Sequence, residues 1–196
     1  LSEKRDDLLR RVSTLAHYSH IVDVEAEAKS IAAKAESLLE KARLEANDLR
    51  QQAEQTARST LDQANQIIQA ALDLSAQKGY RPMAVVVLDD SGHLKAAQRQ
   101  DGASMFRFEV AQAKAWGAVG MGVSSRTLGE RAKGNPNFFV SLSATSDGKF
   151  LPQTGAVVIK DAQGQVIGAV GASGGTGDED ELICIAGVTA VGLAHG

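Results

Sequence analysis

The sequence is poor in the residues that several classes of protein need. It has one cysteine, Cys184, so it can form neither an internal disulfide bond nor a zinc site built from several thiolates. Aromatic residues make up only 4% of the chain, which argues against a surface that stacks nucleic-acid bases. The net charge is −3, without a run of basic residues, so no binding to nucleic acid is predicted. No apolar run reaches about 18 residues, so no membrane span is predicted either.

No secretory signal peptide is visible, and this favours a cytoplasmic protein. The first residue is Leu rather than Met. A leader that has been removed therefore stays open, and with it a periplasmic or secreted location.

Glycine and proline are missing from residues 1–78, whereas all 19 glycines and all 3 prolines lie in residues 79–196. Both residue types interrupt helices, so their absence predicts one or two long helices in the first part. Thr60 and Gln63 fit a capping box that marks a seam, with or without a break in the helix. We therefore divide the chain into a helical, coiled-coil extension over 1–58 and a globular domain over 59–196.

An apolar repeat of 11 residues runs through the predicted helix. The repeat consists of three series of mostly small or apolar residues: Ile31, Ala42, Ala53 and Ala64; Ala35, Ala46, Ala57 and Ile68; Leu38, Leu49, Thr60 and Ala71. A period of 11 corresponds to about 3.67 residues per turn and predicts a nearly straight or slightly right-handed helix pair. The repeat therefore predicts a coiled-coil partner for residues 24–58.

Residues 20–24 break this repeat with three β-branched residues and an aspartate, and they predict a bend between two helices. His17 and His20 lie three residues apart and would share a helix face, a spacing that could bind a metal or haem. We interpret them instead as exposed side chains at the bend.

The order of elements after the extension indicates an α+β fold. A helix over 61–77 is followed by a hairpin, further helices, a second hairpin and a last helix, an order that predicts an antiparallel sheet with helices packed on it. Strands are predicted at 83–88, 93–100, 156–160 and 166–171, and helices at 103–119, from 124 or 125, and from 178. Cys184 is predicted to be a buried thiol and His195 to be disordered.

Six motifs in this domain resemble the GlcG/HbpS-like family, which includes the C-terminal domain of PduO-type cobalamin adenosyltransferases. They are VVLDDSGHL at 86–94, RQDGA at 99–103, AKA at 113–115, GAVVIKD at 155–161, GQVIGAVG at 164–171 and SGG…DE at 173–181. The family often has paired glycines where this chain has Gly155 and Ala156. The resemblance does not extend to residues 1–58, which are only loosely similar to the stalk coiled coils of many bacterial proteins.

The resemblance implies a five-stranded antiparallel sheet flanked by helices, as in profilin or GAF domains. It also implies a homo-oligomer in which dimers assemble into an octamer. Several family members bind haem, and for many no reaction is established. Their haem ligands do not form one shared motif, so the resemblance assigns no axial ligand here.

The glycine-rich stretch Gly171–Gly177, followed by four acidic residues at 178–181, is the first candidate site. A capping box of Thr176 and Glu179 explains most of the acids, because carboxylates stabilise a helix N-terminus. Ser173, Gly174 and Gly175 let the main chain approach a ligand or a second subunit closely.

Charged residues from other motifs complete the predicted ligand site. Arg99 and Asp101 end the second predicted strand, and Lys114 lies in the following helix. A pair of cations suits an organic carboxylate, including a haem propionate, although a set of structural salt bridges is the alternative. His93 follows a tight turn and is either a turn residue or a ligand.

Three functions stay open from the sequence. The first is an oligomeric protein that binds a small molecule, with haem or a related tetrapyrrole as the expected cofactor. The second is an enzyme that acts on a small organic acid in the same pocket. The third is an assembly module without a catalytic role. No nucleophile–base arrangement can be assembled from the motifs, so whether the protein is an enzyme is undecided.

Overall fold

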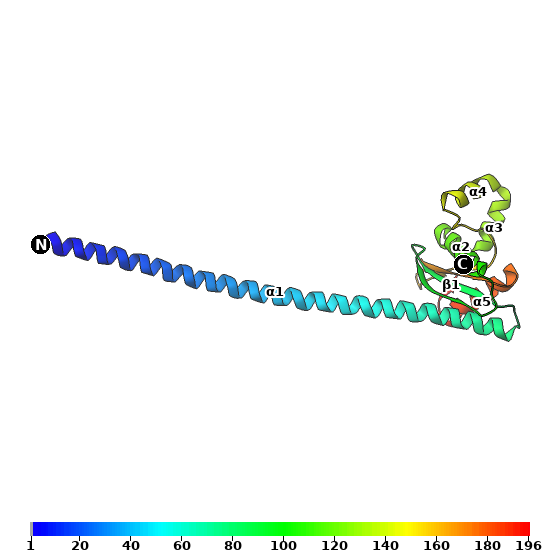
Figure 1. Cartoon of the computed structure of the whole chain (residues 1–196), viewed down its shortest axis with the longest axis horizontal. Coiled ribbons are helices and arrows are strands. Elements are labelled where there is room, and N and C mark those ends of the chain that lie inside the picture. Colours follow the sequence, from blue (N-terminus) through cyan, green and yellow to red (C-terminus); the bar gives the residue numbers. More distant parts are fainter. Residues whose placement is uncertain (1) are drawn as a thin grey trace. The chain divides into compact units, whose positions relative to one another are not determined.

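The computed structural model describes residues 2–196 and divides into two compact units. The first unit ends at Gln55, and the second comprises Thr56–Gly196. Figure 1 shows the strands and the shorter helices that belong to the second unit. Helix α1 (Ser2–Gln77) supplies all of the described first unit and the first element of the second. In the part of the chain that the structure describes, no helix is long and apolar enough to cross a bilayer.

Helix α1 is continuous through residues 20–24, so the predicted bend is wrong. β-branched residues cost only about 0.7 kcal/mol or less each in a helix, and without glycine or proline they do not break it. The helix also continues through Thr60, whose Oγ1 donates a hydrogen bond to the carbonyl oxygen of Thr56, 2.9 Å away. Thr60 therefore lies inside the helix and caps no new one.

The second unit contains a five-stranded sheet in which every neighbouring pair is antiparallel, as the resemblance implies. The strands are β1 (Ala84–Asp89), β2 (Leu94–Arg99), β3 (Ala156–Lys160), β4 (Val166–Ser173) and β5 (Ala194–His195), in the order β2-β1-β4-β3-β5. His195 pairs with Ile159 in this sheet. The prediction that His195 is disordered is therefore wrong, because β5 pairs with the free edge of β3 and this pairing orders the end of the chain.

Helices cover both faces of the sheet because the strands are apolar on both sides. Helix α5 (Gly177–Ala190) and the end of α1 pack on one face, against residues such as Val85 and Val170. Helix α2 (Phe106–Met121) packs on the other, against Val86 and Val158. Helices α3 (Ser125–Gly134) and α4 (Pro136–Thr145) follow α2 and enclose a smaller cluster around Phe150.

The two hairpins use the same turn chemistry. Asp89 Oδ1 accepts hydrogen bonds from the N–H groups of Ser91 and His93, at 3.1 and 2.8 Å. Asp161 Oδ1 accepts the equivalent bonds from residues 163 and 165. In each turn the following glycine has a positive φ, +79° at Gly92 and +80° at 164, which other residues rarely adopt. The turn thus fixes His93 at the start of β2.

Two glycines inside helices are expected to respond in opposite directions to alanine. A Cβ on Gly187 of α5 would lie 2.5 Å from the carbonyl oxygen of Ile67 in α1, so Gly187→Ala should cost about 1–3 kcal/mol through overpacking. A Cβ on Gly120 of α2 would meet no atom within 4 Å beyond its own stretch of helix, so Gly120→Ala should stabilise the protein by about 0.4–1 kcal/mol. Urea denaturation measures both, and the same sign for the two variants would contradict this packing.

Candidate functional site

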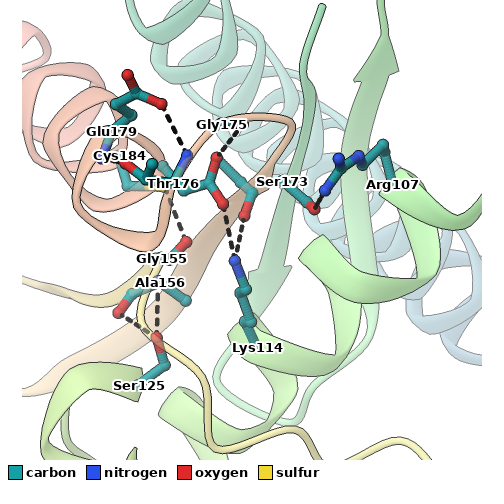
Figure 2. A network of polar contacts seen from close by, with 12 residues as sticks. Arg107, Lys114, Ser125, Gly155, Ala156, Ser173, Gly175, Thr176, Glu179 and Cys184 are labelled. Carbon is teal, nitrogen blue, oxygen red and sulfur yellow. Dashed lines mark hydrogen bonds and ion pairs between the residues drawn. The ribbon is translucent and has the colours of Figure 1, made fainter. Parts of the chain in front are cut away.

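A buried ion pair lies at the centre of the candidate site. Lys114 of α2 donates from Nζ to Asp180 Oδ2 of α5 at 2.8 Å and to the carbonyl oxygen of Ala172 in β4 at 3.2 Å. The two charged side chains are only 6% and 2% exposed. Figure 2 shows Lys114 reaching from α2 toward the loop at Gly175. The pair thereby joins one helix on each face of the sheet to the strand between them.

Asp180 is held by more than its cation. Its Oδ1 accepts a hydrogen bond from the N–H of Gly175 at 3.0 Å. Burial raises the pKa of the Asp180 carboxyl above its usual value, although Lys114, the Gly175 N–H and the charge of Arg107 oppose that rise. The carboxyl is therefore stabilised in its charged form only as long as these partners stay in place.

The four acids after the glycine-rich loop have separate structural tasks. Thr176 and Glu179 form the predicted capping box, with Oε2 of Glu179 accepting from the N–H of Thr176 at 2.7 Å. Asp178 and Glu181 both bind the guanidinium of Arg126 in α3. These two carboxylates raise the pKa of Arg126. Asp180 alone points inward, to Lys114.

The glycines of this region also differ in their tasks. Gly155 has φ +129°, and a Cβ there would lie 2.6 Å from Lys114 Nζ, so the ion pair requires glycine at this position. A Cβ on Gly174 would lie 2.5 Å from the carbonyl oxygen of Pro82. Gly174 thus allows the loop to pack against the start of β1. Gly175 lines a pocket with Lys114 and Ser173.

That pocket, which we call the α2–α5 pocket, has a volume of about 440 Å³. Its charged lining residues are Arg107, Lys114, Asp178 and Asp180, and its apolar ones include Val110 and Leu151. Arg107 Nη1 donates to the Oγ of Ser173 at 3.3 Å. Figure 2 shows the Arg107 and Ser173 side chains pointing toward one another, beside Lys114.

The structure brings only part of the predicted ligand set together. Lys114, Ser173 and Gly175 line the α2–α5 pocket, whereas Arg99 and Asp101 do not. Arg99 is exposed and its Nη1 binds the carbonyl oxygen of Ala103. Because Ala84 pairs with Arg99 on one side and Ser173 on the other, the backbones of the last two are two strands apart, about 10 Å.

His93 lies in a different pocket, which we call the His93 pocket. It has a volume of about 620 Å³ and is lined by the turn at Gly92, by Leu94, by Glu109 and Trp116 of α2, and by the segment 147–149. The His93 imidazole is 79% exposed, and its Nδ1 lies 3.5 Å from Asp89 Oδ1. The predicted site residues therefore belong to two separate pockets beside α2.

Asp89 is a charged neighbour for this imidazole. Burial disfavours its charged form, but hydrogen bonds from the His93 N–H, Lys95 and the Ser91 N–H outweigh burial. The pKa of Asp89 consequently lies below its usual value. An ionised carboxylate facing Nδ1 orients a histidine and leaves Nε2 available for a ligand.

Sequence reasoning missed Arg107, Asp180 and Trp116 as site residues. Arg107 lies seven residues before Lys114, a spacing that places both on one helix face, and this signal was present in the sequence. Asp180 was hidden among acids that a capping role explained. Cys184 is a buried free thiol, as predicted, and burial raises its pKa well above the usual value. Among the described residues, no cluster of three or more His, Cys, Asp or Glu could hold a metal ion.

An open antiparallel sheet with helices on both faces, and with two pockets beside helix α2, defines a class of small α+β domains. Within it, this chain belongs to the HbpS-like family, because the family model described as "Haem degrading protein HbpS-like" matches residues 60–189. No curated protein matches the chain significantly.

Solved structures support the same assignment. The structure titled a PduOC:heme complex has 25% sequence identity and a TM-score of 0.62, with 68% of this chain and 94% of that one covered. A double mutant of HbpS from Streptomyces reticuli has 26% identity and a TM-score of 0.57, with 66% and 84% covered. The protein ORFY from Klebsiella pneumoniae, at 23% identity and a TM-score of 0.62 over 67% and 89%, shares the fold.

The buried ion pair is expected to be essential for stability. Asp180→Asn leaves the Lys114 ammonium buried without a counter-charge and should cost about 3–5 kcal/mol of unfolding free energy. The control is Glu130→Gln, which removes the partner of Lys133 from a pair whose side chains are 68% and 74% exposed; it should cost less than about 1 kcal/mol. If urea denaturation shows that Asp180→Asn loses no more unfolding free energy than Glu130→Gln does, the buried ion pair is not essential for stability.

Proposed function

We propose that this protein binds haem, or a related tetrapyrrole, in the His93 pocket. The observation that carries the proposal is the placement of His93, at the edge of the larger pocket and backed by Asp89. Histidine is a common axial ligand of haem iron, and a carboxylate near its other ring nitrogen raises its basicity as a ligand.

The rest of the His93 pocket fits a large, flat, partly apolar ligand. Its volume of about 620 Å³ lies within the range of about 300–1,000 Å³ usual for ligand pockets. Leu94 is 48% exposed and offers apolar surface, and Trp116 adds an aromatic ring packed on the turn at Gly92. Lys149 would pair with a propionate. Bound haem would supply redox and oxygen chemistry at its iron, while His93 and Lys149 would hold and orient it.

The comparisons support haem as the ligand class. The description of the family names a haem-degrading protein, and a solved relative at 25% identity is a haem complex. The α2–α5 pocket suits haem less well, since its lining contains no His, Met, Cys or Tyr that could bind iron. We therefore assign haem to the His93 pocket and not to the α2–α5 pocket, which contains Lys114.

A haem titration tests this assignment. Wild-type protein should give a saturable shift of the Soret band, and His93→Ala should weaken binding at least about tenfold and change the spectrum, because the iron loses its axial ligand. The control is His17→Ala in α1, which removes an exposed histidine outside the pocket. A wild-type spectrum without a saturable shift rejects haem, and an unchanged spectrum for His93→Ala rejects the site.

We further propose that the protein is a homo-oligomer and that residues 24–58 pair with a second copy of the same helix. The apolar stripe of α1 continues into the second unit, where Ala64, Ile68 and Ala71 are buried against the sheet. In the first unit the same stripe is uncovered, and Ile31 and Leu38 are 59% and 68% exposed. An isolated helix gains no packing energy, so a partner along this stripe supports its stability. The octamer that the family resemblance implies, and the cytoplasmic location, stay predictions.

Native mass measurement tests the helix pairing. Leu38→Glu combined with Leu49→Glu places charges on the stripe and should lower the native mass or the helix content of the full chain, because buried like charges repel. Leu44→Glu is the matched control, since Leu44 is also exposed but lies on another face of the helix. If the double variant keeps the wild-type mass and helicity, residues 24–58 do not pair through this stripe.

A further inference from the structure

We propose that the α2–α5 pocket is a second ligand site, which binds the carboxylate of a small organic monoacid with Arg107 as the anchoring cation. This site is distinct from the His93 pocket: the two share no lining residue. The inference therefore stands independently of haem binding.

The charges around the pocket leave one cation without a counter-ion. Lys114 is paired with Asp180 at 2.8 Å, and Asp178 is paired with Arg126, which Glu181 also binds. Arg107, by contrast, forms no ion pair among the residues that the structure describes. Of the two described cations that line the pocket, Arg107 is therefore the one without a paired carboxylate, and a ligand with one negative charge would pair with it.

The donors in the pocket match a carboxylate. A guanidinium carries five N–H donors in a planar fork that fits a carboxylate in two-point fashion, and the hydrogen bonds found among the described residues use one of them, to Ser173. Ser173 is 1% exposed. Its Oγ accepts that bond, and within residues 2–196 its own O–H donates to no protein acceptor. A buried hydroxyl proton beside a free guanidinium edge is an arrangement that a ligand oxygen would complete.

The pocket walls limit the rest of the ligand. Val110 and Leu151 provide apolar surface for a short aliphatic chain. Gln153 provides an amide and Thr154 a hydroxyl, which can bind a second polar substituent of the ligand, such as a hydroxyl or keto group. A cavity of about 440 Å³ is at the small end of the usual range of about 300–1,000 Å³. A short hydroxy or keto acid fits these features.

More highly charged ligands fit the same pocket poorly. Asp178 and Asp180 both line it, and their carboxylates repel a second negative charge on the ligand. Dicarboxylates and phosphate should therefore bind more weakly than a monoacid, even though the N-terminus of α5 lies beside the pocket. An uncharged ester should also bind weakly, because it cannot pair with Arg107.

Calorimetric titration of the full chain with L-lactate and pyruvate tests the ligand class, with methyl lactate, succinate and inorganic phosphate as comparisons. At least one of the two monoacids should bind saturably at millimolar concentration. Methyl lactate, succinate and phosphate should each bind at least about tenfold more weakly than that acid. Binding of neither monoacid overturns the proposal, and so does equal or tighter binding of the ester, succinate or phosphate.

Variants of Arg107 test the anchoring cation. Arg107→Gln should weaken monoacid binding at least about tenfold, and Arg107→Lys should restore part of it, because lysine keeps the charge but loses the planar fork. Arg131→Gln in α3 is the matched control, since it removes an exposed arginine outside the pocket. Thermal unfolding checks that each variant is folded. Unchanged affinity of folded Arg107→Gln overturns the assignment.

The same titration separates this site from the haem site. His93→Ala should leave monoacid affinity unchanged, and Arg107→Gln should leave the Soret titration unchanged, because the pockets share no residue. If His93→Ala weakens monoacid binding as much as Arg107→Gln does, the acid occupies the His93 pocket and the proposed second site is wrong.

Discussion

In the second unit one buried interaction, the ion pair of Lys114 and Asp180, connects the helices on the two faces of the sheet. Two charges taken out of water are costly, and only close pairing with further hydrogen bonds offsets that cost. Here the carbonyl oxygen of Ala172 and the N–H of Gly175 provide those bonds. The missing side chain of Gly155 leaves the space that the ammonium needs. One helix from each face of the sheet is thereby fixed relative to β4, and the wall of the α2–α5 pocket is fixed with them.

Helix α2 organises both candidate sites because different faces of it meet different partners. Lys114 and Arg107 face the glycine-rich loop after β4, whereas Glu109 and Trp116 face the turn that carries His93. The two pockets also differ in chemistry. One combines an exposed imidazole with an aromatic wall, and the other combines a guanidinium with a buried hydroxyl. This difference is the reason for assigning a tetrapyrrole to the first and a small acid to the second.

The apolar repeat of helix α1 is buried in the second unit and exposed in the first. This 11-residue repeat is buried against the sheet at Ala64, Ile68 and Ala71, and it is exposed at Ile31, Leu38 and Leu49. In the second unit the sheet supplies the apolar surface that the stripe needs. In the first unit a second helix of the same kind would supply it, since the stripe is mostly alanine and allows close approach of two backbones.

The sequence alone determined the long helix, the two hairpins, the antiparallel sheet and the capping box at Thr176, because periodicity, turn residues and caps are local signals. It did not reveal that α1 continues through residues 20–24, since a weak local preference does not break a helix without glycine or proline. It also grouped Arg99 with Lys114, although only the register of β2, β1 and β4 decides that Arg99 lies away from the pocket. Only the tertiary structure decided which residue pairs with Lys114, that Arg107 lies beside Ser173, and that His93 lies away from both. Contacts between residues 66 positions apart in the chain depend on how the helices pack on the sheet and not on their own sequences.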